Sequence, residues 1–269
     1  MNLLYTASGF AVGLLVGISG VGGGSLMTPL LVFLFGFKPA VAVGTDLLYA
    51  AITKTAGVFV HHGKHRSVDW RIVSYLALGS LPMAGVTLYV LHNLMAIGKE
   101  ITGTITFTLG IALLLTASAL LLRSLLLKFK PEQEIDDKHS SPDNAGRFSP
   151  RWEKFATVLT GAILGVLVTL SSVGAGALGT VALLFLYPKM STLKIVGTDL
   201  AHAIPLTAVA GLGHLSLGNF DVELLGSLLL GSVPGIWIGS HLSAKIPEKV
   251  LRPILALLLL VIGLKFVMQ

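Results

Sequence analysis

The sequence predicts an all-α integral membrane protein made of two inverted-topology repeats. Three observations lead to this fold class. Apolar residues make up 54% of the 269 residues and charged residues only 12%, about half of the roughly 25% usual in soluble domains. The apolar residues fall in long runs, and the second half of the chain repeats motifs of the first. This composition leaves too little polar surface to cover a water-facing globule, which excludes an ordinary soluble enzyme.

The apolar runs are long enough to serve as membrane spans. In order, they cover residues 3–37, 40–60, 72–91, 101–127, 155–187, 193–215, 224–242 and 250–267. The first and the fifth are too long for a single pass, and glycines interrupt both. We expect each of these two to form a broken, re-entrant helix hairpin, so that each half has one broken hairpin and three full transmembrane helices.

A hydrophilic linker separates the two halves. Twelve of the charged residues fall between Lys128 and Lys154, in a stretch that also holds three prolines. This composition is typical of a solvated connection. We therefore predict a first transmembrane repeat over residues 1–127, a cytoplasmic linker over 128–152 and a second transmembrane repeat over 153–269.

Five motifs recur in the same order at a spacing of 152 or 153 residues. The most specific, Gly-Thr-Asp-Leu, occupies residues 44–47 and returns unchanged at 197–200. The others pair residues 21–24 with 173–176, His62 with His214, Asp69 with Asp221, and residues 79–82 with 231–234. Shared membrane composition would repeat Leu and Ala rather than these motifs, so the pattern indicates a duplication.

The basic residues indicate that the two halves lie in opposite orientations. Lys and Arg concentrate in loops on the cytoplasmic side of a membrane protein. Three of them lie at or near the 61–71 loop, and none lies in the equivalent 216–223 loop. After the third span the bias reverses, with only Lys99 in the first half and three basic residues between 243 and 252. This predicts an inverted repeat with both termini outside, which is a transporter architecture.

The two helix breaks are candidates for an anion site. Glycines let the backbone turn, and a new helix behind each break would point free N–H groups and the positive end of its dipole into the protein. The candidate substrate-binding residues here are Gly22, Gly23, Gly24, Ser25, Ser171, Ser172, Gly174 and Gly176. The alternative is structural, because small residues also allow close packing of membrane helices.

Asp46 and Asp199 are candidates for ion or proton coupling, and their neighbours Thr45 and Thr198 for substrate binding. Carboxylates inside a membrane are costly and mark ion paths. The alternative is that Thr and Asp cap the start of each span. In an inverted repeat we expect Asp46 on the outer side and Asp199 on the inner side, flanking a midplane site rather than both touching it.

Lys54 and His202 complete the candidate site. Lys54 is a substrate-binding candidate because a buried ammonium group needs a partner, either Asp46 two turns away or an anionic substrate. The alternative is that Lys54 extends to the cytoplasmic side. His202 lies one turn after Asp199 and can relay protons, or it can make a hydrogen bond in a packed core.

We predict no metal site, no other cofactor and no enzymatic activity. Three histidines, His61, His62 and His65, suit a solvated helix end better than a metal site. There is no Cys, and no stretch forms a recognised nucleophile motif. The sequence pI near 9.6 reflects basic loops rather than a nucleic-acid partner. The expected partners are a small anion and membrane lipid, and the sequence leaves a homodimer open.

With these motifs in view, the chain resembles the sulfite exporter TauE/SafE family from Leu4 to Phe266. The resemblance rests on residues 17–25 with their glycine run, on Pro29, and on the Gly-Thr-Asp-Leu motif. The second copy is weaker, because Ala175 replaces a Gly. The resemblance implies a permease that exports small sulfur-containing anions, such as sulfite or organosulfonates, across a bacterial or archaeal plasma (inner) membrane.

Two hypotheses of function follow. The leading one is an anion transporter that works by alternating access and holds the anion between the two helix breaks. It would be driven either by proton coupling through Asp46, Asp199 or His202, or by the membrane potential. The alternative is a cation or metal permease that uses the same three side chains.

Overall fold

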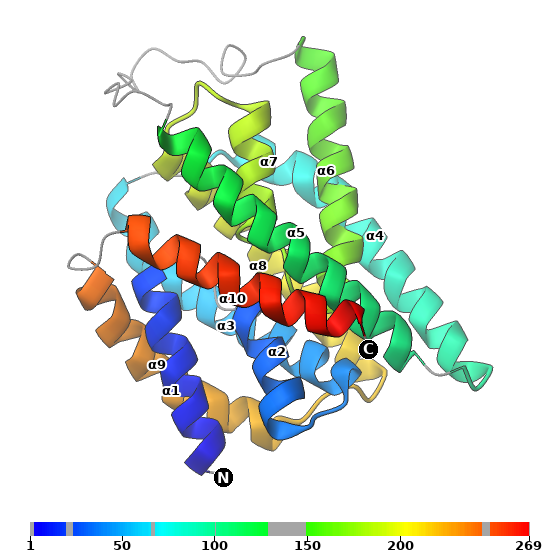
Figure 1. Ribbon diagram of the computed structural model, residues 1–269. Helices are drawn as coiled ribbons and strands as arrows, with labels where there is room; N and C mark the ends of the chain where they lie inside the picture. Colours follow the sequence, from blue (N-terminus) through cyan, green and yellow to red (C-terminus); the bar gives the residue numbers. More distant parts are fainter. Residues whose placement is uncertain are drawn as a thin grey trace.

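The computed structural model describes residues 3–19, 24–65, 68–99, 101–128, 149–243 and 248–268. In this part of the chain all regular secondary structure is α-helical (Figure 1). The helices are α1 (Leu3–Ser19), α2 (Gly24–Phe35), α3 (Pro39–His65), α4 (Trp70–Ala96), α5 (Thr102–Lys128), α6 (Pro150–Ser171), α7 (Leu178–Leu186), α8 (Thr192–Ser216), α9 (Val222–Ser243) and α10 (Glu248–Val267).

Helix lengths and surface composition both fit a membrane. Five helices of the described part are long and apolar enough to cross a membrane, namely α4, α5, α6, α8 and α9. Large apolar side chains such as Leu78, Tyr89 and Leu257 are more than 60% exposed. Contiguous apolar surface of this kind is uncommon on soluble monomers and suits contact with lipid. The chain is therefore a multi-pass membrane protein.

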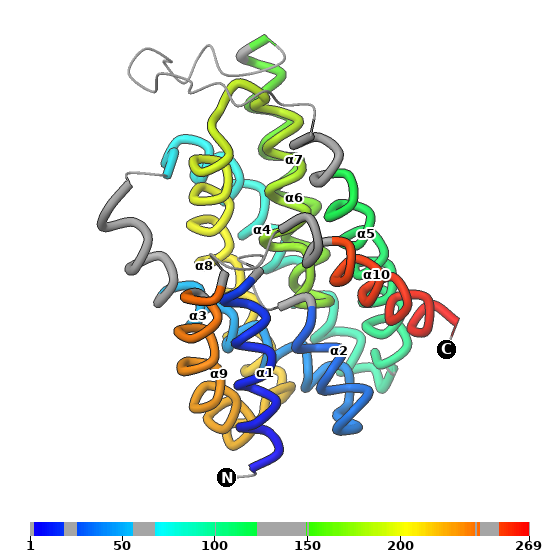
Figure 2. The backbone as a smooth tube through the Cα atoms, turned by 60° about the vertical axis from the view of Figure 1, so that its left-hand side comes forward, coloured from blue at the N-terminus to red at the C-terminus, as the bar shows by residue number. Residues whose placement is uncertain are grey.

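Helices of the first half pair with helices of the second. The main contacts join α1 to α9, α4 to α6, α3 to α8, and α5 to α10. Figures 1 and 2 show α1 running away from the N-terminus in one direction, while α6 runs from the linker in the opposite direction. The pairings join matched helices of the two halves, and the inverted orientation of the halves in a membrane stays a prediction.

Glycines bring two of these pairs into close contact at matched positions. In α1, a Cβ added to Gly13 would lie 2.5 Å from the Ser232 carbonyl oxygen in α9. In α6, a Cβ added to Gly165 would collide in the same way with the carbonyl oxygen of Ser80 in α4. One helical turn earlier, Gly9 and Gly161 meet Leu228 and Leu76. The backbones approach closely because these positions lack side chains.

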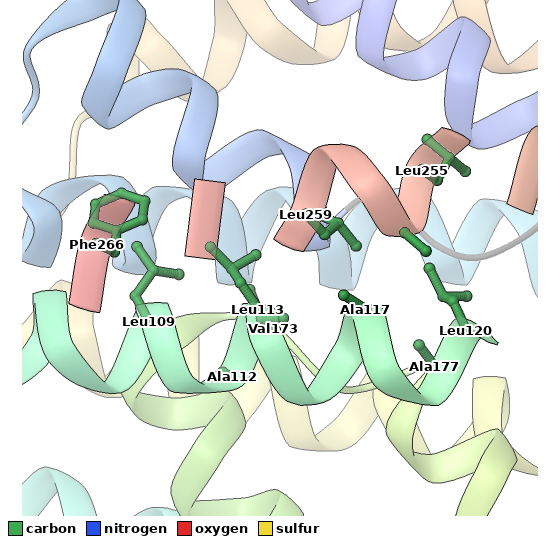
Figure 3. Packing of buried hydrophobic residues seen from close by; sticks show 11 residues of the cluster. Leu109, Ala112, Leu113, Ala117, Leu120, Val173, Ala177, Leu255, Leu259 and Phe266 are labelled. Atoms are coloured by element: carbon green, nitrogen blue, oxygen red, sulfur yellow. The ribbon is translucent and has the colours of Figure 1, made fainter. Parts of the chain in front are cut away.

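The break between α6 and α7 lies beneath α5 and α10. Ser172 adopts a left-handed conformation with φ 58°, and Gly174 and Gly176 have φ 113° and 124°. Buried apolar side chains of α5 and α10 pack together with Val173 and Ala177 of the break (Figure 3). The non-helical backbone is thus covered by protein, which is where a membrane protein tolerates it. The glycine break expected here is confirmed.

Candidate functional site

The centre of the molecule holds a buried lysine. Lys54, in the middle of α3, is only 7% exposed. Its Nζ donates a hydrogen bond of 3.0 Å to the carbonyl oxygen of Ala175, in the break between α6 and α7. The side chain therefore faces the protein, and the alternative that it extends to the cytoplasmic side is wrong. Lys54 connects a long helix of the first half to the helix break of the second.

Asp46 and Asp199 occupy matched positions in α3 and α8. Thr28 in α2 donates a hydrogen bond of 2.5 Å to Asp46 Oδ2, and Thr180 in α7 donates one of 2.8 Å to Asp199 Oδ2. Both carboxylates are buried. In each half, a threonine in the short helix, α2 or α7, therefore donates a hydrogen bond to the aspartate in the following helix, α3 or α8.

The capping alternative for these aspartates is wrong. Asp46 lies about two turns inside α3, which begins at Pro39. Asp199 lies equally deep in α8, whose N-terminal cap is Ser191 with a hydrogen bond from the Lys194 backbone N–H. Because both groups lie in helix interiors, they are free of the capping role and available to the site.

The two aspartates share one electrostatic partner, and the expectation that they flank the site rather than both touch it stays a prediction. Both Asp46 and Asp199 interact electrostatically with the ammonium group of Lys54. The physical reason is the direct packing of α3 against α8, which brings the equivalent helices of the two halves together at the centre. The charge of Lys54 therefore acts on two carboxylates that come from opposite halves.

The serines of the second break differ in their availability. Ser171 is occupied within its own segment, because its hydroxyl donates to the Leu167 carbonyl at 2.6 Å and accepts from the Val173 N–H at 3.1 Å. Ser172 Oγ is buried, has no hydrogen-bond partner among the described residues, and faces Asp46. Of the two, Ser172 is the better candidate to contact a ligand.

The first break lies largely outside the described residues. This holds for Gly22 and Gly23. Gly24 and Ser25 begin α2, but the burial of these two residues lies outside the described part. The side chains of His61, His62 and His65 likewise lie outside the described part. The roles of these residues stay predictions.

Thr45 and Thr198 tie the two halves together. The Thr45 hydroxyl accepts a hydrogen bond of 3.2 Å from the backbone N–H of Asp221, at the start of α9. The Thr198 hydroxyl accepts one of 2.9 Å from the backbone N–H of Asp69, at the start of α4. This gives the threonines a structural role across the repeats, and their substrate-binding role stays a prediction.

His202 adds a titratable ring to the central cluster. Its Nε2 is 2.8 Å from the Ser80 hydroxyl, and its Nδ1 has no hydrogen-bond partner among the described residues. The charge of Lys54 acts on this ring. The hydrogen bond in a packed core is thus present, and the proton-relay role stays a prediction.

Gly174 and Gly176 have no side chains, so any contact that they make with a ligand would come from their backbone groups in the break.

Three participants were missed from the sequence: Thr28, Thr180 and Ser80. Thr28 and Thr180 follow the two breaks at the repeat spacing of 152 residues, so extending the repeat past the glycines would have found them. Ser80 belongs to the recognised 79–82 motif but received no role. The carbonyl of Ala175 carries no sequence signal, because any residue supplies one.

The arrangement defines the class of protein. A metal site is not formed by the described residues, which contain no group of three or more His, Asp or Glu suited to a metal ion. Instead, a buried cation bonds to non-helical backbone between the two halves of a helical membrane protein, and two buried carboxylates interact with it electrostatically. This is the architecture of a membrane transporter.

Comparison with known proteins agrees with this class. The profile of the family described as "Sulfite exporter TauE/SafE" matches residues 5–266, and the chain belongs to this family. It is 40% identical over 268 residues to the probable membrane transporter protein YjnA of Bacillus subtilis, covering 99% of this chain and 100% of the relative. It is 28% identical over 275 residues to the probable membrane transporter protein MJ0441 of Methanocaldococcus jannaschii, covering 95% and 91%. No solved structure matches the chain.

Proposed function

We propose that this protein is a secondary transporter that exports small sulfur-containing anions, such as sulfite or organosulfonates, across a bacterial or archaeal inner membrane. The observation that carries the proposal is the ammonium group of Lys54, buried between the halves and hydrogen-bonded to the Ala175 carbonyl in a helix break. A buried cation attracts an anion strongly because little water screens it. The family supports the sulfur-containing substrate class.

Several polar atoms near Lys54 lack hydrogen-bond partners among the described residues. They include Asp46 Oδ1, Ser172 Oγ and His202 Nδ1. Buried polar atoms are normally paired, so unpaired ones indicate room for a ligand or water. The Ser172 hydroxyl and the imidazole can donate hydrogen bonds to an oxyanion. The anion is therefore proposed to lie between Lys54 and the break at residues 172–177.

Alternating access is proposed from the packing of the halves. The site lies where α3 meets α8, and both carry equivalent residues to it. In inverted-repeat transporters, one repeat or bundle moves against the other around a site at their interface. We propose the same movement here, with repeats over residues 1–127 and 153–269, the 128–152 linker in the cytoplasm and both termini outside.

The cation or metal permease is less well supported by this geometry. Lys54 already places a positive charge beside Asp46 and Asp199. A divalent cation bound to the two carboxylates would be repelled by that ammonium group. A small anion would instead be attracted by the ammonium group of Lys54.

A binding screen on the purified protein in detergent tests the proposal. Thermal unfolding is measured with sulfite, sulfate, sulfoacetate, taurine, thiosulfate, acetate and divalent cations. A bound ligand at 100 times its Kd adds about 2.7 kcal/mol of stability. We expect saturable stabilisation by a sulfur oxyanion that is weakened in Ser172→Ala and retained in Ser118→Ala, whose hydroxyl is exposed on α5. Stabilisation by divalent cations alone would overturn the proposal.

A further inference from the structure

We infer that each anion is carried together with one proton, which binds to Asp46. The inference rests on the proposed anion transport and names how that same site is coupled. Among the described residues, the buried ammonium group of Lys54 interacts electrostatically with two buried carboxylates, Asp46 and Asp199. Hydrogen bonds place Lys54 and Asp199 against the same segment, through the Ala175 carbonyl and the Thr180 hydroxyl.

The charge balance of the cluster changes when an anion arrives. With both carboxylates ionised and Lys54 protonated, these three groups carry a net charge of minus one. A monoanion at Lys54 would place three negative charges around a single positive one, in surroundings that screen charge weakly. One proton taken up with the anion restores the original net charge. Binding of the anion without the proton is therefore disfavoured.

Asp46 is the group that is placed to take the proton. Its Oδ2 receives a hydrogen bond from Thr28, and its Oδ1 has no partner with good hydrogen-bond geometry among the described residues, although the Ser172 hydroxyl faces the carboxylate. A carboxylate only accepts hydrogen bonds, whereas a protonated carboxyl group donates one. With a proton on Oδ1, Asp46 changes from a group that repels the anion to one that can hydrogen-bond to it.

The described residues around Asp46 include four other titratable groups, Lys54, Tyr49, Asp199 and His202. On its own helix, α3, the titratable groups that act with it are Lys54 and Tyr49. The helix α2 and the α6–α7 break present hydroxyl groups, those of Thr28 and Ser172. On α8, Asp199 and His202 each interact electrostatically with Lys54. The α9 helix contributes the hydroxyl of Ser232, beside Tyr49.

The balance has a consequence for the driving force. The proton enters from the side on which the anion binds and leaves with it on the other side. One positive and one negative charge cross together, so transport of a monoanion moves no net charge. The membrane potential then does not drive the anion, and export follows its own concentration gradient and the pH gradient.

Proteoliposomes containing the full-length protein test this inference. The substrate is isethionate, because a sulfonate remains a monoanion across the working pH range and carries no proton of its own. A pH-sensitive dye in the lumen reports protons, labelled isethionate reports anion flux, and potassium with valinomycin sets the potential. We expect isethionate entry to acidify the lumen with one proton per anion. The accumulation ratio should change about tenfold per pH unit and stay constant with potential.

Uncoupled movement of a single charge predicts a different result. A potential of 100 mV would then change the accumulation ratio about 40- to 50-fold. Flux of isethionate or sulfite that follows the potential and moves no protons would overturn the inference and leave the proposed function standing. Absence of flux for every anion tested would overturn both.

Two variants locate the proton. Asp46→Asn keeps the size of the side chain but cannot gain a proton, so its remaining flux should move no protons and become sensitive to potential. Asp221→Asn is the matched control, because Asp221 caps α9 outside the cluster and Asn caps equally well. It should retain one proton per anion. Proton coupling that persists in Asp46→Asn would overturn the assignment to Asp46, and the wild-type measurement decides the coupling even if this variant fails to fold.

Discussion

The two halves of the molecule share a scaffold but not its chemistry. In both, a threonine after the helix break holds an aspartate in the next helix, through Thr28 with Asp46 and Thr180 with Asp199. Yet the position of Lys54 in the first half is occupied by Thr207 in the second. A duplicated frame with a single cation offers one place for an anion, rather than one in each half.

His202 and Tyr49 also occupy equivalent positions in the two halves but differ in chemistry. His202 contacts Ser80, while the equivalent residue of the first half, Tyr49, lies beside Ser232. The serines correspond at a spacing of 152 residues, and their ring partners at 153. Scaffold contacts therefore survive the duplication, and the side chains that face the site have diverged. Equivalent substitutions in the two halves therefore serve as matched tests of one another.

The largest effect is expected from Lys54→Met. It leaves two buried carboxylates without the positive charge that acts on them, and uncompensated buried charge is costly. We expect sulfite binding to fall by more than about 100-fold, measured by calorimetry on folded protein. The double variant Lys54→Thr with Thr207→Lys returns the cation from the other half and should recover part of the binding. Unchanged affinity in Lys54→Met would show that the halves do not share one cation.

Gly13→Ala and Gly165→Ala should be about equally destabilising. Each adds a Cβ against a backbone carbonyl oxygen of the paired helix, Ser232 or Ser80, and overpacking costs about 1–3 kcal/mol. Thermal unfolding in detergent and the yield of folded protein measure the effect. Gly85→Ala is the control, since its added Cβ would have nothing within 4 Å. A large effect in only one of the two variants would contradict matched packing.

Thr45→Val and Thr198→Val should each lower stability by about 1–3 kcal/mol, because each leaves a backbone N–H at the start of α9 or α4 without its acceptor. Anion affinity should stay within about threefold of the wild-type value. Loss of one hydrogen bond to the bound anion would change the affinity by more than this. Thermal unfolding and calorimetry separate the two effects. Loss of affinity at unchanged stability would instead restore the substrate-binding role predicted for these threonines.

The smallest effect is expected at the helix caps. Asp69 accepts from the backbone N–H of Arg71 and Ile72, and Asp221 accepts from that of Leu224. Asp69→Ala and Asp221→Ala should each cost about 1 kcal/mol of stability, while the Asn variants should cost less, because Asn also caps well. Thermal unfolding measures both pairs. A larger loss in the Asn variants than in the Ala variants would rule out capping.

Much of the fold was predictable because membrane spans and duplications leave strong patterns. The long apolar runs placed the helices, and the repeated Gly-Thr-Asp-Leu motif identified equivalent residues before any contact was known. Lys54 was recognisable because an ammonium group inside an apolar span needs a partner. Its actual bond to the Ala175 carbonyl was not, since a backbone acceptor has no signature in the sequence.

The arrangement of the site was harder to predict. Helices that are apolar on all sides hide which face meets a neighbour, so the sequence did not reveal that Asp46 and Asp199 bond to threonines of α2 and α7 and that the charge of one lysine acts on both. The capping alternative failed because α3 already begins at Pro39, well before the Thr-Asp pair. The GxxxG spacings of Gly9 with Gly13 and Gly161 with Gly165 were overlooked signals of the α1–α9 and α4–α6 contacts.

The most direct test is to locate a bound anion by anomalous diffraction from crystals grown with selenite, the selenium analogue of sulfite. We predict one selenium peak per chain, within hydrogen-bond distance of Lys54 Nζ and the Ser172 hydroxyl, that disappears in Lys54→Met. A peak far from Lys54, or two symmetric peaks that ignore the difference between Lys54 and Thr207, would contradict a single anion site shared by the two halves.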